Sequence, residues 1–124
     1  MYQKVSLIGN LGRKPELKFS QNGKPFTSFS LATNKKFING QGDEVEQVCW
    51  WRITTWGRQA EVVAEYANKG DRVFVEGEMS PDASGNPRVF QTKDGAWASG
   101  YEMTAQVVKL LDGKKQGDDD DDQF

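Results

Sequence analysis

Hydrophobic and polar positions in the first part of the chain alternate with a period of two residues, as they do in half-buried β-strands. The alternation over residues 5–11 predicts a first strand, which we expect to bend or bulge near Gly9 and Gly12. Two more alternating runs, 16–20 and 26–33, flank the dipeptide Asn22-Gly23. This dipeptide is a strong turn signal, so the two runs are predicted to be neighbouring strands.

The period becomes that of a helix over residues 58–68. Apolar residues there recur at positions i, i+3, i+4 and i+7, namely Ala60, Val63, Ala64 and Ala67. This spacing predicts an amphipathic helix of about three turns. We expect Lys69 and Gly70 to close the helix, with Gly70 as a left-handed cap.

Strands are predicted for most of the remaining chain. Residues 46–56 are rich in β-branched and aromatic side chains and form the expected strand before the helix, and 72–79 form the strand after it. Residues 80–100 contain two prolines and several glycines, so they are expected to form an extended, hairpin-like excursion. The last strand is predicted over 101–111. We expect Val73 and Val75 to point inward, and Met103, Ala105 and Val107 to share one face of the last strand.

The predicted order is three strand regions, one helix and two strands. An all-β fold with one helix, the five-stranded OB-fold barrel, has this order, with its helix between the third and fourth strands. A chain of 124 residues is long enough for one domain with a core of its own. We expect the barrel with extended hairpin loops over residues 1–111, a short linker over 112–117 and a disordered acidic tail over 118–124.

The strand over 46–56 carries the most informative side chains. At a period of two, one face presents Trp50, Arg52, Thr54 and Trp56 and the other presents Cys49, Trp51, Ile53 and Thr55. Arginine is poorly suited to a dry core, so we expect the first face to be open to solvent. Two exposed indole rings beside a guanidinium form a platform on which bases can stack. In the alternative interpretation, Trp50 and Trp56 are core residues and Arg52 extends to the surface.

Basic residues recur within a few positions of other aromatic rings. They are Lys35 and Lys36 before Phe37, Arg58 after Trp56, and Arg88 before Phe90. Single-stranded nucleic acid is bound by such a combination, because cations follow the backbone while rings stack on bases of any sequence. Duplex DNA is a poorer fit, since no recognition helix is predicted.

Composition excludes several classes of enzyme. The chain has no histidine and a single cysteine, Cys49. Histidine-dependent catalysis, histidine metal sites and multi-cysteine zinc sites are therefore excluded, and we expect no catalysis, no cofactor and no metal. Cys49 is predicted to share a face with Ile53, which favours a buried, inert thiol.

The longest uninterrupted apolar run, Val48 to Trp51, has four residues, so we expect no membrane association. The first residues show no signal-peptide pattern, and we expect a cytoplasmic location.

The net charge of −2 conceals an uneven distribution. Residues 1–117 carry 16 basic and 13 acidic side chains, whereas Asp118 to Asp122 are all acidic. The body is therefore weakly basic and the tail strongly acidic. The tail ends in Phe124, and a basic pocket on a partner protein can bind a terminal aromatic ring together with its carboxylate.

Several short stretches occur together in a distinctive order and spacing. They include Ile8-Gly9-Asn10-Leu11-Gly12, Pro15-Glu16-Leu17, Leu31-Ala32-Thr33, Trp50 to Arg52, Gly57-Arg58, Ala60-Glu61-Val62, Lys69-Gly70 and Val75-Glu76-Gly77. In these stretches the sequence resembles the bacterial single-stranded DNA-binding protein family, including its phage-encoded relatives. The resemblance covers residues 2–111 and the extreme C-terminus.

The resemblance implies an OB-fold homotetramer that binds and protects single-stranded DNA during replication, recombination and repair, in the nucleoid. It implies stacking by Phe37, Trp50, Trp56 and Phe90 and backbone contacts from Lys4, Arg52, Arg58, Lys69 and Arg88. It also implies recruitment of replication and repair proteins by the tail, through Asp119, Asp120, Asp121, Asp122 and Phe124.

Three features depart from the family pattern. The linker before the tail is short, and Asp122-Gln123 replaces the usual Ile-Pro before the final phenylalanine. The excursion over 80–100 is long, and its Trp97 is either an extra stacking ring or a packed one.

Two other functions remain open from the sequence. One is an OB-fold protein-interaction adaptor of the replication-restart type, which the Phe124 tail supports. The other is a carbohydrate-binding barrel, since exposed tryptophans also stack on sugars; the basic body argues against it.

Overall fold

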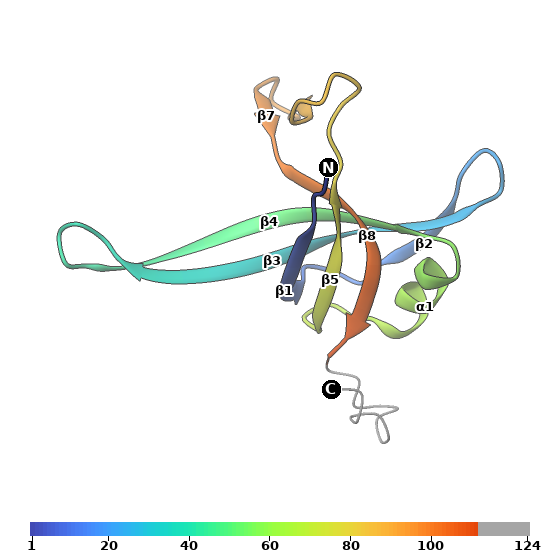
Figure 1. The fold of residues 1–124 in the computed structure, drawn as a ribbon, viewed down its shortest axis with the longest axis horizontal. Coiled ribbons are helices and arrows are strands. Elements are labelled where there is room, and N and C mark those ends of the chain that lie inside the picture. The colour runs from blue at the N-terminus through green and yellow to red at the C-terminus, as the bar shows by residue number, and fades with distance from the viewer. Residues whose placement is uncertain (112–124) are drawn as a thin grey trace.

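The computed structural model describes residues 1–111, which form a strand-rich fold with one helix (Figure 1). The elements in chain order are β1 (Val5–Leu11), β2 (Glu16–Phe19), β3 (Pro25–Ile38), β4 (Glu44–Trp56), α1 (Arg58–Tyr66), β5 (Arg72–Met79), β6 (Val89–Gln91), β7 (Trp97–Ser99) and β8 (Tyr101–Leu110). Within this range no helix is long and apolar enough to cross a membrane.

Five strands close into a barrel in the order β1-β5-β8-β4-β3, and β3 returns to pair with β1. The β2 strand extends the sheet beside the first part of β3, and β4 and β8 are the parallel neighbours. The single helix follows β4 and precedes β5. The predicted five-stranded OB-fold with its helix between the third and fourth barrel strands is therefore confirmed.

The barrel closes where the end of β1 meets β3, with Asn10 opposite Ala32 and Leu11 opposite Leu31. A Cβ atom added at Gly9 would overlap the carbonyl oxygen of Ala32. Only glycine allows the two backbones to approach this closely. The predicted bend at Gly9 thus corresponds to the closure point of the barrel.

Inward side chains from every barrel strand and from α1 form one core. The buried hydrophobic residues are Leu11, Phe29, Leu31, Ile53, Ala60, Val63, Ala67, Val73, Val75, Met103 and Ala105. Two buried hydroxyls are satisfied by backbone carbonyls: Thr27 donates to Ala60 and Thr55 to Ala105, both at 3.2 Å. Within the barrel, the alternation predicted for β3 and β4 therefore distinguishes the side chains in the core from those on the outer surface.

The prediction that Val107 shares a face of β8 with Met103 and Ala105 is wrong. A bulge shifts the β5–β8 register, so that Glu76 pairs with Val107 but Gly77 pairs with Ala105. The extra residue reverses the alternation, and Val108 rather than Val107 packs against the core.

Two boundaries also differ from the prediction. The strand expected to end at Thr33 continues to Ile38, because β3 and β4 stay paired as a long arm beyond the barrel (Figure 1). Both faces of the arm are largely exposed, so its residues show no simple alternation. At the other boundary, α1 ends at Tyr66, and Gly70 lies in a separate turn in which Asp71 N donates to Asn68 O (3.0 Å).

Candidate nucleic-acid interface

The predicted row on β4 lies on the outside of the barrel. Trp50 is 54% exposed and Trp56 42%, Arg52 between them is exposed, and the alternate residues Ile53 and Thr55 are buried. The interpretation of the two tryptophans as core residues is therefore wrong. We call Trp50, Arg52, Thr54 and Trp56 the ring row.

Small side chains on β3 keep most of the ring row open. Ala32 lies opposite Trp50, Ser30 opposite Arg52 and Ser28 opposite Thr54. The hydroxyls of Ser28 and Thr54 are hydrogen-bonded at 3.1 Å. Because no large side chain stands across from Trp50 or Arg52, their outer surfaces are available to a flat ligand.

Each indole ring is also held from one side. A Cβ atom at Gly12 would lie 3.0 Å from Cζ3 of Trp50, so the ring packs directly on the glycine backbone. The ring of Trp56 packs on Phe26 with centroids 4.9 Å apart, and the ammonium of Lys24 lies 5.7 Å from its centroid. Such contacts fix the orientation of a stacking surface before any ligand arrives. The sequence reasoning missed Gly12, Phe26 and Lys24 as supports, although the β3–β4 register identifies Phe26.

The ring row is bordered on its other side by β8. The parallel register places Glu102 beside Arg52 and Thr104 beside Thr54. Glu102 also forms an ion pair with Arg88, at 3.7 Å. Arg88 is thereby held by a residue whose strand neighbour is Arg52 of the ring row. No local sequence signal predicts this, because it depends on the pairing of distant strands.

Phe37, a predicted stacking residue, is not part of the ring row. It lies on the arm opposite Val45. Phe37 is on the same side of the paired strands as Lys35 and Cys49, whereas Ala32 and Trp50 are on the other side. The ammonium of Lys35 lies 5.9 Å from the Phe37 centroid. Phe37 is 37% exposed, so it offers a separate ring on the opposite side of the arm.

Lys36 lies on the same side of the arm as Trp50, opposite Glu46.

Phe90 and Trp97 lie on the small β6–β7 hairpin, apart from the barrel wall (Figure 1). Phe90 pairs with Ala98 and Gln91 with Trp97, so the two rings belong to opposite faces of this hairpin. Trp97 is 70% exposed, so it is not a packed core ring.

Three predicted basic contacts are paired with carboxylates. Lys4 lies 3.5 Å from Glu76, Arg58 lies 3.8 Å from Glu61, and the Arg88 pair with Glu102 is described above. The nearby Glu76 carboxylate raises the pKa of Lys4 above its usual value of 10.5. These surface pairs contribute little to stability, so a phosphate can replace the carboxylate at low cost.

Lys69 is exposed in the turn after α1, and the neighbouring Gly70 amide donates to the Leu11 carbonyl (2.9 Å). This bond ties the Lys69 turn to the end of β1.

The cysteine prediction needs a correction. Cys49 is only partly buried, because it lies opposite Thr33 where the arm leaves the core. The neighbouring inward ring, Trp51, stacks on Tyr101 with centroids 5.0 Å apart.

Among residues 1–111, no group of three or more His, Cys, Asp or Glu side chains is placed to hold a metal ion. The predicted partner-binding residues Asp119, Asp120, Asp121, Asp122 and Phe124 lie outside the described residues.

Comparisons with known proteins agree with the geometry. A sequence model of the single-strand binding protein family matches residues 2–111. A relative named single-stranded DNA-binding protein from Helicobacter hepaticus is 34% identical over 119 residues, covering 96% of this chain and 66% of that protein. One of the same name from Neisseria meningitidis is 35% identical over 113 residues, covering 91% and 62%. The chain thus spans slightly less than two thirds of the length of these relatives.

Solved structures show the same fold. A Plasmodium falciparum SSB in complex with ssDNA superimposes with a TM-score of 0.73 at 24% identity, covering 90% of this chain and 96% of that one. The single-stranded DNA binding protein from Thermus aquaticus gives a TM-score of 0.71 at 26% identity, covering 91% of this chain and 52% of that one.

The contact between Gly12 and Trp50 generates a prediction. Gly12→Ala places a methyl group about 3.0 Å from the indole, so the ring must shift by a few tenths of an ångström. We expect the indole N–H resonance of Trp50 to move in a ¹⁵N–¹H spectrum, while that of the distant Trp97 stays in place. Gly40→Ala is the control, since a Cβ there meets no atom within 4 Å. An unchanged Trp50 resonance in Gly12→Ala would contradict the contact.

Proposed function

The chain belongs to the single-strand binding protein family, and we propose that it binds single-stranded DNA without sequence specificity. The bases stack on the ring row and on Phe37 and Phe90, and lysines and arginines contact the backbone. The protein performs no catalysis. It protects exposed strands during replication, recombination and repair, in the bacterial cytoplasm and nucleoid.

The observation that carries this proposal is the pair of exposed indole rings with Arg52 between them. Each stacked base contributes about 1–3 kcal/mol irrespective of its identity, because every base has a π face. Held rings also lose little conformational freedom on binding. The platform therefore favours unpaired strands, since the bases of a duplex are already stacked on one another.

The charge pattern supports rings rather than cations as the main source of affinity. Residues 1–117 have only three more basic than acidic side chains, from 16 and 13. Several cations, such as Lys4 and Arg58, already have carboxylate partners. We therefore propose that cations position the strand and make binding salt-dependent, while stacking provides most of the free energy of binding.

We further propose a homotetramer, in which the free edge of β1 is an assembly surface. Among the described strands, positions 5–8 of β1 pair only with β5, which leaves their other edge open. Ile8, opposite the partly buried Phe74, is 57% exposed on the outer face. An exposed strand edge beside an exposed aliphatic side chain favours pairing with another copy.

The acidic tail is proposed to recruit replication and repair proteins through Asp119, Asp120, Asp121, Asp122 and Phe124. This part of the proposal rests on the tail sequence and on the family membership. The five consecutive aspartates also repel DNA phosphates, so the tail is not expected to bind DNA itself.

Substitution of the ring row tests the proposed binding. We expect Trp50→Ala and Trp56→Ala each to weaken binding of poly-dT by about 1–3 kcal/mol. Tryptophan fluorescence titrations at several salt concentrations measure the affinity, and the log–log salt slope should be about −0.7 per phosphate neutralised.

Tyr66→Ala serves as the control for the two tryptophan variants, because Tyr66 is a 49% exposed ring on α1. Its affinity should equal that of the wild type. Wild-type affinity in both tryptophan variants would refute the proposal that bases stack on the ring row.

Assembly through β1 is tested by Ile8→Glu. A carboxylate at this position would have to be buried against the partner, so we expect the tetramer to dissociate in sedimentation velocity experiments. Ile38→Glu is a matched control, since Ile38 is 66% exposed at the end of the arm. A tetramer that survives Ile8→Glu would exclude this surface.

Removal of residues 118–124 distinguishes a DNA-binding protein from an interaction adaptor. An adaptor would lose its function with the tail, whereas a DNA-binding protein would keep its affinity for DNA. Loss of five aspartates makes the chain net positive, so DNA affinity should stay equal or rise at low salt. The gain should vanish as salt screens the charge. A truncated protein with reduced affinity for poly-dT would show that the tail contributes to DNA binding itself.

A further inference from the structure

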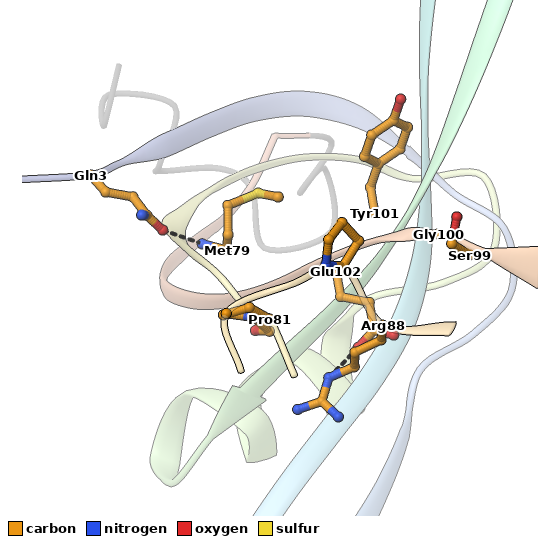
Figure 2. Close-up of a pocket in the computed structure, with 11 residues that line it drawn as sticks. Gln3, Met79, Pro81, Arg88, Ser99, Gly100, Tyr101 and Glu102 are labelled. Carbon is orange, nitrogen blue, oxygen red and sulfur yellow. Dashed lines mark hydrogen bonds and ion pairs between the residues drawn. The ribbon is translucent and has the colours of Figure 1, made fainter. Parts of the chain in front are cut away.

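A groove of about 490 Å³ lies where the chain before β1, the end of β5 and the start of β8 come together (Figure 2). Its apolar lining includes Met79, Pro81 and Tyr101, and its polar lining includes Arg88 and Glu102. This volume is within the range of about 300–1,000 Å³ that is typical of small-ligand sites. Arg88 is the one lining residue that the family resemblance implies as a DNA contact, and the rest of the groove has no role in the proposal above.

The apolar wall presents a ring that is exposed and held in place. Tyr101 is 52% exposed, and Trp51 stacks on it with an interplanar angle of 28°. Met79 is 41% exposed, and its backbone N–H donates to Oε1 of Gln3 at 3.2 Å. A fixed aromatic ring beside a polarizable thioether is suited to a flat, weakly polar group such as a nucleobase.

The polar wall carries a cation that can exchange its partner. The side chains of Arg88 and Glu102 are 51% and 25% exposed, and Nε lies 3.7 Å from the carboxylate. An exposed pair at this distance contributes little free energy. Arginine binds phosphate with bidentate geometry, so a phosphate oxygen can take the place of Glu102.

The groove adjoins the ring row at Glu102. Glu102 lies beside Arg52 in the β4–β8 register, so the groove begins next to the middle of the row. Figure 2 shows Tyr101 and Glu102 pointing to opposite sides of β8. A strand that leaves the ring row at Arg52 would therefore meet Arg88 first and then pass over the start of β8 towards Tyr101.

Gly100 leaves open the path of the DNA strand over the start of β8. It lines the groove, its φ is outside the left-handed region, and an added Cβ would meet no atom within 4 Å. The fold therefore does not require glycine at this position. The effect of the missing side chain is to leave free space in the groove.

We propose that the groove binds one nucleotide of the single strand that stacks on the ring row. Its base lies against Tyr101 and Met79, and its phosphate replaces Glu102 on Arg88. This inference rests on the proposed function and adds a subsite to it.

Blocking the groove tests the subsite. Dissociation constants are measured for dT oligomers lengthened one nucleotide at a time. For the wild type, we expect the affinity to increase in one step of about 5- to 150-fold when the strand becomes long enough to fill the groove. In Gly100→Leu this step should be absent, whereas affinity for shorter oligomers stays unchanged. Gly40→Leu, another open glycine outside the left-handed region, is the matched control and should keep the step.

Two variants that each remove one negative charge test whether a phosphate replaces Glu102 on Arg88. Glu102→Gln removes the competing carboxylate, so the step should increase at least about twofold at low salt. Glu65→Gln removes the same charge from the exposed side of α1 and should leave the step unchanged. An equal response of the two variants would overturn the exchange.

Three results would overturn the subsite. The first is a step that persists in Gly100→Leu. The second is wild-type binding of poly-dT without any step, which leaves the ring-row proposal intact. The third is a lower sedimenting mass of DNA-free Gly100→Leu than of the wild type, because the groove would then be covered by a second copy of the chain. Failure of the wild type to bind poly-dT at all would refute the proposed function together with the subsite.

Discussion

The contact between the backbones of β1 and β3 at Gly9 and Ala32 is the constraint on which the rest of the structure depends. It joins β1 to β3 and so closes the five strands β1-β5-β8-β4-β3 into a barrel, and closure gives each of these strands an inner and an outer face. Once Ile53 and Thr55 must point inward, alternation forces Trp50, Arg52 and Trp56 outward. An open sheet could place either face of β4 in the core. The exposure of the ring row is therefore a consequence of closure, and the small residues on β3 preserve it.

The sequence was informative where one face of a strand meets the core and the other meets water. This condition holds for the barrel part of β4, so Trp50, Arg52 and Trp56 were placed correctly from alternation alone. It fails on the arm, where both faces are exposed, and the strand therefore continues to Ile38 without a periodic signal. It fails again at the bulge opposite Gly77, where one extra residue reverses the phase of β8 and moves Val107 outward.

Long-range pairing explains what local patterns could not supply. Glu102 lies beside Arg52 only because β8 pairs with β4 in parallel, and the two residues are far apart in the chain. The carboxylate partners of Lys4 and Arg88 likewise come from distant strands. A count of charges therefore overstates how many cations are available to a phosphate. The arrangement suits ligands that offer both flat rings and anions able to displace these carboxylates.

The parallel pairing of β4 with β8 also has a consequence for biosynthesis. Met103 and Ala105 belong to the core, yet they lie in the last strand of the barrel, between β4 and β5. A nascent chain that ends before Tyr101 has β1, β3 and β4 available but no strand to join β4 to β5. The barrel can be completed only after residues 101–110 have left the ribosome, because non-local pairs form only after both partners exist. Until that moment β4 and β5 lack the strand that pairs with both of them, and such unpaired edges favour aggregation.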